Sequence, residues 1–356
     1  MSLIQDRKLE HYQLCSTNKC QSNNSTHLED IILEKSCFPH YSLSEISTKI
    51  TFYEKELDFP LIIGCMTGGS KEVTKYNKIL AETANEMNIA IGIGSQRSGI
   101  ENKSEEILES YRIVRECAPK SFIIGNIGCY QLIQYGEILD DLISMIKGNA
   151  IEIHLNFEQE LVQFEGDREK LDLHSLKNII SNWNGITIGK QVGHGMMKKD
   201  IEICQEMGMK GIDVGGIGGT SFAGVECLRA EKKQLKNQIE IGKLLWNFGV
   251  PTVMSIWEAS LCSLPIISGG GIRNGLDIMK SISLGASCCS IATPFVNLSL
   301  KGTEECINYV KLLKQELESM MFLCNCNSIE NIKNVNKIIT GDLYHWIKQR
   351  SKQLKL

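Results

Sequence analysis

The chain has 356 residues, a formal net charge of −4 at pH 7 and a pI near 6.0. This acidic balance argues against a nucleic-acid-binding protein, although a local basic patch could still hold a phosphate. No apolar run reaches the roughly 18 residues of a membrane helix, and the 14 cysteines are scattered with no recognisable secretory signal, so we expect a cytoplasmic protein without a disulfide framework or a membrane partner.

Residues 1–58 are polar and irregular, with a short helix expected from Gln5 to Leu14 and a flexible segment at 16–25. From Pro60 onward, short apolar runs alternate with longer segments of helical spacing. The apolar runs, interpreted as strands, are 61–64, 89–93, 122–125, 151–153, 186–189, 211–214, 250–254 and 266–268. The segments of helical spacing between them are 72–87, 104–117, 132–146, 200–207 and 276–284.

This alternation implies parallel strands buried on both faces and joined by crossover helices. Eight strands in about 230 residues favour an α/β TIM (β/α)8 barrel over an open doubly wound sheet, which usually has five or six. Residues 300–356 lack the rhythm and predict terminal helices at 304–320 and 343–352. The expected division is an N-terminal arm at 1–58, a barrel at 59–300 and C-terminal helices at 301–356.

A dense polar cluster at 154–168 follows the fourth predicted strand. Its carboxylate and amide oxygens suit a hard cation such as magnesium, while His154 and Arg168 suit phosphate oxygens. A solvated loop is the plain alternative. Unusual residues also follow most of the other strands, at 65–69, 94–97, 126–128, 190–195, 215–221 and 269–275. In a barrel these loops converge on one mouth, where active sites lie.

Glycine-rich turns near the end of the barrel give the strongest cofactor signal. The turn at 269–275, and Ala292 and Thr293 at the next one, would aim backbone N–H groups at a phosphate. Glycines that only permit tight turns are the alternative. There is no nicotinamide fingerprint at a first strand and no Walker loop. A flat, phosphate-bearing cofactor such as FMN therefore fits the mouth better.

Single side chains at the mouth leave several roles open. Lys190 directly follows a strand and should point into the mouth, although it could be a surface lysine. His154 could be a phosphate ligand, a general acid or a hydrogen-bonded core histidine. Gln159 and Glu160 point to different sides if their segment is extended.

A cationic cluster near the start of the chain brings Arg7, Lys8 and His11 onto about one helical turn. By itself, the cluster is better explained as a solvated helix start. The cluster becomes informative because the rest of the chain indicates a site that needs a diphosphate-binding lid.

Taken together, these residues resemble the type 2 isopentenyl diphosphate isomerases, the FMN-dependent isomerases of isoprenoid synthesis. The motifs run in family order over nearly the whole chain. They are Arg7-Lys8-x-x-His11, Met66-Thr67-Gly68-Gly69, Gly94-Ser95-Gln96-Arg97, Asn126-Ile-Gly, His154-Leu-Asn156-x-x-Gln159-Glu160, Glu165-Gly166-Asp167-Arg168, Lys190 in Lys-x-x-Gly, Asp213-Val-Gly-Gly-x-Gly-Gly-Thr220 and Gly270-Gly271-Ile272-Arg273. The segments at 154–160 and 165–168 are specific to this family, whereas many FMN barrels share the terminal glycine loops.

The resemblance implies that isopentenyl and dimethylallyl diphosphate interconvert by proton addition and removal, with reduced FMN as acid/base cofactor, Mg²⁺, and NADPH as the reductant. It also implies a homo-oligomer, a tetramer or an octamer. The implied FMN-binding residues are Met66, Thr67, Gly68, Ser95, Asn126, Lys190, Thr220, Gly270, Gly271, Ile272, Ala292 and Thr293. The implied substrate-binding residues are Arg7, Lys8, His11, Ser95, Gln96, Arg97, His154, Asn156 and Gln159. Gln159 and Lys190 would be catalytic, and Glu160 would bind the magnesium.

Four positions depart from the family pattern: Gln191, Phe164, Ser290 and His194 replace residues that the family usually has there. The rival enzyme readings are an FMN-dependent hydroxy-acid oxidase and an inosine-monophosphate dehydrogenase. The first needs a histidine–arginine pair late in the barrel, where Arg273 has no histidine nearby. The second needs a catalytic cysteine loop, for which Cys227 and Cys262 are poor candidates. A flavin reductase and a barrel that binds FMN without catalysis are further alternatives.

Overall fold

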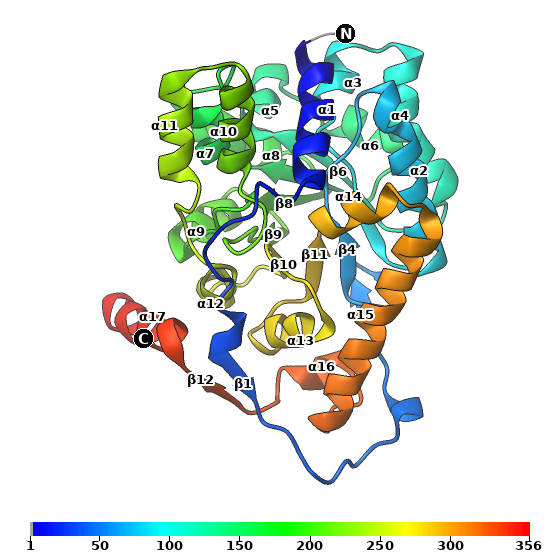
Figure 1. Ribbon diagram of the computed structural model, residues 1–356, viewed down its shortest axis with the longest axis vertical. Helices are drawn as coiled ribbons and strands as arrows, with labels where there is room; N and C mark the ends of the chain where they lie inside the picture. The colour runs from blue at the N-terminus through cyan, green and yellow to red at the C-terminus, as the bar shows by residue number, and fades with distance from the viewer. Residues whose placement is uncertain (1–2) are drawn as a thin grey trace.

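A closed barrel of eight parallel strands forms the centre of the computed structural model, which describes residues 3–356 (Figure 1). The strand order around the barrel is β10-β11-β4-β5-β6-β7-β8-β9. The strands are β4 (Leu61–Ile63), β5 (Ala90–Gly92), β6 (Ile123–Gly128), β7 (Ala150–His154), β8 (Ile186–Lys190), β9 (Gly211–Asp213), β10 (Ile266–Gly269) and β11 (Cys288–Ile291). The predicted TIM barrel is confirmed.

Helices between the strands form the outer layer. They are α2 (Lys71–Glu86), α3 (Arg97–Glu101), α4 (Glu105–Cys117), α5 (Cys129–Tyr135), α6 (Leu139–Ile146), α7 (Phe157–Val162), α8 (Leu173–Ser181), α9 (Lys198–Glu206), α10 (Phe222–Lys232), α11 (Lys236–Leu245), α12 (Thr252–Ser260), α13 (Gly275–Ser283) and α14 (Thr293–Ser299). In α2, the buried Val73, Leu80, Ala81 and Ala84 recur at helical spacing and cover the barrel. The helix expected at 132–146 is instead two helices, α5 and α6, separated at Gly136.

The seventh and eighth strands were misassigned from sequence. The run at 250–254 is not a strand, because Pro251 precedes α12, whose residues Val253 and Met254 are buried in the core. A helix buried on nearly every side has the continuous apolar pattern of a buried strand. The run at 266–268 is the seventh strand, and the eighth is Cys288–Ile291, where two thiols and a serine weaken the usual strand signal.

The N-terminal segment contacts both ends of the barrel. Helix α1 (Leu3–Ser16) reaches the mouth, and a hairpin of β2 (Ile50–Phe52) and β3 (Lys55–Leu57) closes the opposite end. Phe52 and Leu57 of the hairpin pack into the lower core of the barrel with Phe122. The 3-10 helices η1 (Leu28–Asp30) and η2 (Leu43–Glu45) and strand β1 (Ile31–Leu33) lie between.

The stretch 16–25, predicted to be flexible, packs against the barrel. Cys20 is fully buried, and the N–H of Ser22 donates to the carbonyl oxygen of Gly219 at 2.7 Å. The side-chain amide of Gln21 donates to Thr220 Oγ1 at 3.0 Å. The chain from α1 to η1 is therefore anchored along the side of the barrel.

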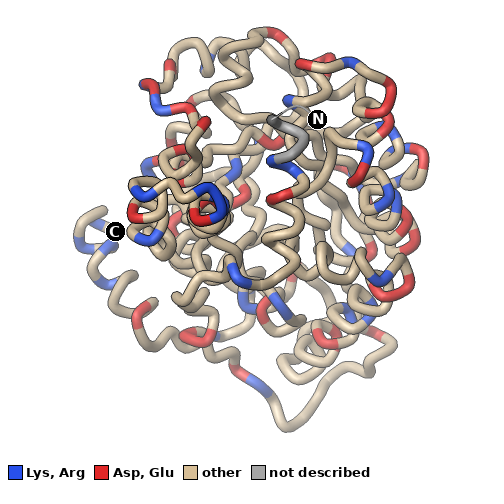
Figure 2. The backbone as a smooth tube through the Cα atoms, turned by 45° about the horizontal axis from the view of Figure 1, so that its top comes forward, with Lys and Arg blue, Asp and Glu red and all other residues tan. Residues whose placement is uncertain are grey.

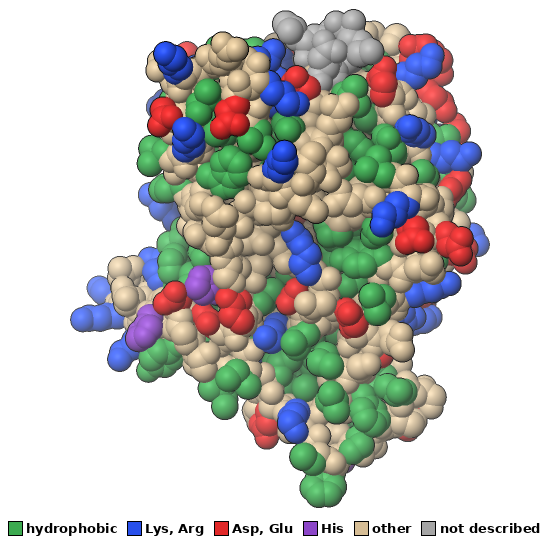
Figure 3. Space-filling model, viewed as in Figure 1, with side chains coloured by type: hydrophobic (Ala, Val, Ile, Leu, Met, Phe, Trp, Pro, Cys, Tyr) green, Lys and Arg blue, Asp and Glu red, His purple; other side chains and the backbone are tan. Residues whose placement is uncertain are grey.

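The C-terminal elements are α15 (Thr303–Leu323), α16 (Ile329–Ile332), β12 (Lys337–Ile339) and α17 (Gly341–Leu354), and both predicted terminal helices are confirmed. Strand β12 pairs antiparallel with β1 below the barrel, so the N-terminal and C-terminal segments are joined there (Figure 1). Basic and acidic residues are interspersed over the outer helices (Figure 2). Apolar side chains are exposed at the lower end, away from α1 (Figure 3). Among residues 3–356, no helix is long and apolar enough to cross a membrane.

Candidate active site

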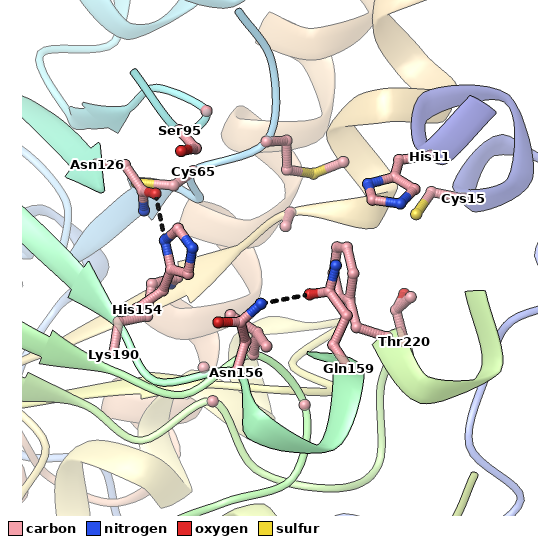
Figure 4. Close-up of a pocket in the computed structure, with 18 of the residues that line it drawn as sticks. His11, Cys15, Cys65, Ser95, Asn126, His154, Asn156, Gln159, Lys190 and Thr220 are labelled. Atoms are coloured by element: carbon pink, nitrogen blue, oxygen red, sulfur yellow. Dashed lines mark hydrogen bonds between the residues drawn. The ribbon is translucent and has the colours of Figure 1, made fainter. Parts of the chain in front are cut away.

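A cavity opens at the carboxyl ends of the barrel strands, beneath α1 (Figure 4). Its empty space, with the open mouth included, is about 1470 Å³. Most of the expected residues line it: Arg7, Lys8, His11, Met66, Ser95, Arg97, Asn126, His154, Asn156, Gln159, Glu160, Lys190, Thr220, Gly270, Gly271, Ala292 and Thr293. Residues expected to bind the cofactor and residues expected to bind the substrate thus line the same cavity.

Four expected residues lie outside the lining of the cavity: Thr67, Gly68, Gln96 and Ile272. Thr67 is hydrogen-bonded to the side chain of Asn77 behind the cavity wall. Ile272 is buried in the hydrophobic core between the barrel and its helices. None of these four residues faces the cavity in this structure, and their expected binding roles stay predictions.

Gln96 is fully buried, and both ends of its side-chain amide are hydrogen-bonded within the protein. Its Nε2 donates to the carbonyl oxygen of Leu142 at 2.8 Å, and its Oε1 accepts from the N–H of Asn126 at 3.1 Å. Its own N–H donates to the carbonyl oxygen of Asn126 at 2.8 Å. Gln96 therefore holds the backbone of Asn126 instead of facing the cavity.

Lys190 at the end of β8 lies between two buried carboxylates. The strand register places it beside Asp213 of β9, to which it is ion-paired, and Glu152 Oε2 of β7 lies 3.3 Å from its Nζ. Burial acts to lower the pKa of Lys190, but Asp213 and Glu152 outweigh it and raise this pKa. The Lys190 ammonium therefore stays charged at the base of the cavity.

The two carboxylates beside Lys190 were given no role from sequence. A signal was present, because Glu152 and Asp213 each interrupt an otherwise apolar strand. A carboxylate inside such a run must face a buried partner, since an unpaired charge is costly to bury. Burial raises the pKa of Glu152 despite the nearby lysine.

His154, at the end of β7, is held by Asn126 of β6. Its Nδ1 lies 2.8 Å from Asn126 Oδ1 (Figure 4). Burial, followed by the charges of Lys190, Arg7 and Lys8, lowers the pKa of His154 to about 3. The imidazole of the ligand-free protein is therefore neutral at physiological pH, and a hydrogen-bonding role remains open to it.

The polar segment after β7 is helical, not extended. Asn156 caps the short helix α7, and its Nδ2 donates to Gln159 Oε1 at 3.1 Å and to Glu160 Oε1 at 2.9 Å. The other oxygen of Glu160 accepts from the N–H of Asp167 at 2.9 Å, and burial raises the pKa of Glu160. Gln159 Nε2 reaches Glu226 Oε1 at 3.3 Å. The side-chain amide of Asn156 thus holds the side chains of both Gln159 and Glu160 in place.

Helix α1 carries cationic residues over the cavity, between α10 and α14 (Figure 1). Lys8 Nζ donates to the carbonyl oxygens of Gly68 and Ser95 at 2.7 and 2.6 Å and to the hydroxyl of Tyr111 at 2.7 Å. These bonds use all three ammonium protons. Burial lowers the pKa of Lys8, with a further contribution from Arg7. Lys8 therefore anchors α1 and could meet a substrate only by exchanging a bond.

His11, Arg7 and Arg97 complete the basic side of the mouth. His11 Nε2 lies 2.7 Å from Oε1 of Glu226 on α10, a buried carboxylate that the motifs did not reveal. Arg97 Nε donates to Glu101 at 2.7 Å. The sequence signal for Glu226 is a charged residue on the buried face of an otherwise apolar helix segment.

The glycine-rich turn after β10 offers free donors to the cavity. Gly270 and Gly271 have φ values of 97° and 81°, which side-chain-bearing residues rarely adopt. The N–H groups of Gly270, Gly271 and Ala292 donate to no acceptor among residues 3–356. The Thr293 hydroxyl lies 2.6 Å from that of Thr220. Unpaired donors around one hollow fit a phosphate, so the residues present fit FMN.

The four departures from the family pattern have distinct settings. Gln191 lines the cavity and donates to Glu158 at 2.9 Å. Ser290 also lines it, within β11. His194 is buried outside the lining, with Nδ1 2.7 Å from the carbonyl oxygen of Phe248. The ring centroid of Phe164 lies 5.3 Å from the guanidinium carbon of the buried Arg229.

No group of three or more His, Cys, Asp or Glu side chains that could hold a metal ion occurs in the part of the chain that the structure describes. The expected magnesium ligand, Glu160, lines the cavity as a single carboxylate. Magnesium is commonly held by one or two carboxylates together with substrate phosphates and water. The position of Glu160 is compatible with that arrangement.

The fold and the cavity define a class, the FMN-dependent enzymes built on a (β/α)8 barrel. Residues 154–338 match the family of FMN-dependent dehydrogenases. A flavocytochrome b2 with sulfite bound superposes with a TM-score of 0.65 at 16% identity, over 90% of this chain and 81% of that chain. A mandelate oxidase superposes with a TM-score of 0.62 at 14% identity, over 93% of this chain and 96% of that chain. At these identities the likeness shows the fold alone.

Within this class, the chain belongs to the isopentenyl-diphosphate delta-isomerase family of the FMN-dependent type. The isopentenyl-diphosphate delta-isomerase of Methanosarcina barkeri is 41% identical over 358 residues, covering 100% of this chain and 97% of that protein. That of Methanocaldococcus jannaschii is 40% identical over 358 residues, covering 98% of each. The resemblance inferred from the motif order is confirmed, and the two oxidoreductase alternatives are set aside.

Proposed function

We propose that this protein interconverts isopentenyl diphosphate and dimethylallyl diphosphate, using FMN in its reduced form and Mg²⁺. The observation that carries the proposal is the composition of one cavity. Unpaired backbone donors and a buried lysine lie at its barrel end, and cationic residues of α1 and α3 lie at its mouth. Family membership supports the same reaction.

The barrel end of the cavity would hold the cofactor. The N–H groups of Gly270, Gly271 and Ala292 would bind its phosphate, and Lys190 would place a fixed positive charge beside its ring. Reduced FMN, when bound, supplies a group that can give a proton to the substrate and take one away. Asp213 and Glu152 hold Lys190 in place and keep it charged.

The mouth would bind the diphosphate. Arg7 and Arg97 suit phosphate oxygens because a guanidinium can donate two parallel hydrogen bonds. His11 and the neutral His154 would add single hydrogen bonds, and Glu160 would hold Mg²⁺ against the diphosphate. Burial raises the pKa of Glu160. A bound cation would oppose this effect and favour the charged form of the carboxylate.

Gln159 would lie beside the carbons that gain and lose protons. The amide of Gln159 does not titrate, so its role would be to orient the substrate. Its hydrogen bonds to Asn156 and Glu226 would hold the amide in place for this role. Reduction by NADPH, assembly into a tetramer or octamer, a role in isoprenoid biosynthesis and a cytoplasmic location belong to the same proposal.

The experiment is an anaerobic incubation with FMN, Mg²⁺, a reductant and isopentenyl diphosphate in deuterated water, followed by NMR. Deuterated dimethylallyl diphosphate should form only when the flavin is reduced, and a Gln159→Ala variant should lose this activity. Stoichiometric consumption of NADPH would indicate a flavin reductase instead. Folded, FMN-loaded protein that yields neither product nor exchange would refute the isomerase proposal and leave a non-catalytic FMN barrel.

A further inference from the structure

We propose that Arg229 is a positioning residue that fixes helix α1 over the cavity by joining three segments of the chain. Arg229 lies on α10, does not line the cavity, and has a side chain only 3% exposed. No sequence motif singled it out. The part of this inference that concerns substrate rests on the proposed function, whereas the part that concerns α1 does not.

The guanidinium of Arg229 uses each of its three nitrogens on a different carboxylate. Its Nε donates to Glu10 of α1 at 2.8 Å. One terminal nitrogen donates to Glu226 of the same helix at 2.6 Å, and the other to Glu165, in the segment after α7, at 3.2 Å. A planar guanidinium can satisfy three directions at once, which a lysine ammonium on a flexible stem does less well.

Two of these carboxylates continue to residues that line the cavity. The second oxygen of Glu226 lies 2.7 Å from His11 Nε2 and 3.3 Å from Gln159 Nε2. Glu165 Oε1 lies 3.6 Å from Arg7. Arg229 is thus one carboxylate away from Arg7 and His11 of α1 and from Gln159 of α7.

Phe164 supports this arrangement from one side. The guanidinium carbon of Arg229 lies 5.3 Å from the centroid of the Phe164 ring, within the range of a cation–π contact. Phe164 is one of the positions at which this chain departs from the family pattern. Its ring fixes the plane in which Arg229 meets its three carboxylates.

Charge explains why the arginine cannot be removed without moving α1. Burial acts to raise the pKa of Glu226, but His11 and Arg229 outweigh it and lower this pKa to about 2. Without Arg229, the carboxylates of Glu10, Glu165 and Glu226 would face one another with only Arg7 and His11, both on α1, beside them. The segments that carry Glu165 and Glu226 adjoin barrel strands, whereas α1, which carries Glu10, has no barrel strand next to it. We therefore expect α1 to be the segment that moves.

The test is an Arg229→Met variant, examined by hydrogen exchange of the α1 amides in ligand-free protein and by FMN titration. Exchange at α1 should rise about tenfold or more because local opening becomes easier, while FMN affinity should stay within about twofold because that site lies on other elements. KM for isopentenyl diphosphate should rise about tenfold with a smaller change in kcat. This pattern is expected when residues of α1 bind the substrate less well in both its ground and transition states.

The matched control is Arg350→Met, which breaks a partly buried ion pair between α17 and Glu258, away from the cavity. It should leave exchange at α1 and KM unchanged. If Arg229→Met does not fold, Glu10→Ala removes one of the three links and should give the same pattern at about threefold. Unchanged exchange at α1, or an equal rise in the control, would overturn the proposal. Because exchange is measured without substrate, this outcome is independent of whether the protein is an isomerase.

Discussion

Removal of the positive charge between Glu152 and Asp213 should destabilise the barrel strongly. A Lys190→Met substitution keeps an unbranched side chain but leaves two buried carboxylates without their cation. Breaking a buried ion pair by removing one partner costs about 3–5 kcal/mol. At roughly 2 °C per kcal/mol for a large domain, Tm should fall by roughly 6–10 °C. Lys190 at the base of the cavity should therefore also stabilise the barrel.

The pH dependence gives the sharper test. Burial already raises the pKa of Glu152 in the native protein, and loss of Lys190 removes an opposing charge. A carboxyl group with a raised folded pKa contributes stability that is present below its ordinary pKa, about 4, and is lost as the pH rises through the folded value. The deficit of Lys190→Met relative to the native protein should therefore be larger at pH 8 than at pH 5.

Denaturant unfolding of the FMN-free protein, followed by tryptophan fluorescence at both pH values, measures this deficit. Neutralising both carboxylates, with Glu152→Gln and Asp213→Asn added to Lys190→Met, should restore most of the stability, because an uncharged set needs no cation. Lys49→Met, which breaks an exposed pair, should cost less than about 1 kcal/mol. A deficit that does not change with pH, or one below about 1 kcal/mol, would refute the reasoning.

Three further outcomes are expected. Gln96→Leu should cost about 1–3 kcal/mol for the hydrogen bonds lost to the Leu142 carbonyl and the Asn126 N–H, measured by denaturant unfolding, and should weaken FMN binding. The ring signals of His154 should not shift in NMR between pH 5 and 8, and the native state should lose stability as the pH falls from about 6.5 towards 3 because only the unfolded chain takes up this proton. Gly270→Ala should abolish FMN binding in a fluorescence titration, since a Cβ there would collide with a neighbouring carbonyl oxygen, whereas Gly302→Ala, equally strained but in open space, should not.

The strands were predictable wherever their residues were characteristic. Seven of the predicted runs overlap barrel strands, because β-branched residues bounded by glycine or proline are a local signal. The two errors share a cause. The buried helix α12 has the composition of a strand, while the strand Cys288–Ile291 has the composition of a loop. Only the pairing of that strand with β4 and β10 distinguishes it.

The candidate site was predictable as a set of positions but not as a set of contacts. The order of the motifs placed most of the expected residues on one cavity. It did not reveal that Gln96 turns away from the cavity, nor that Glu226 and Arg229 stand behind α1. These two residues lie in an apolar helix, where a pair of charges three residues apart is more often a surface pair.

The sequence by itself determined the alternation of strands and helices, the barrel, and the end at which polar residues gather, because each depends on neighbours along the chain. Only the tertiary structure decided what those residues touch. Lys8 bonds to Gly68, 60 positions away, and His11 to Glu226, 215 positions away. Such partners are brought together by barrel closure and by the packing of α1, and no local pattern records them.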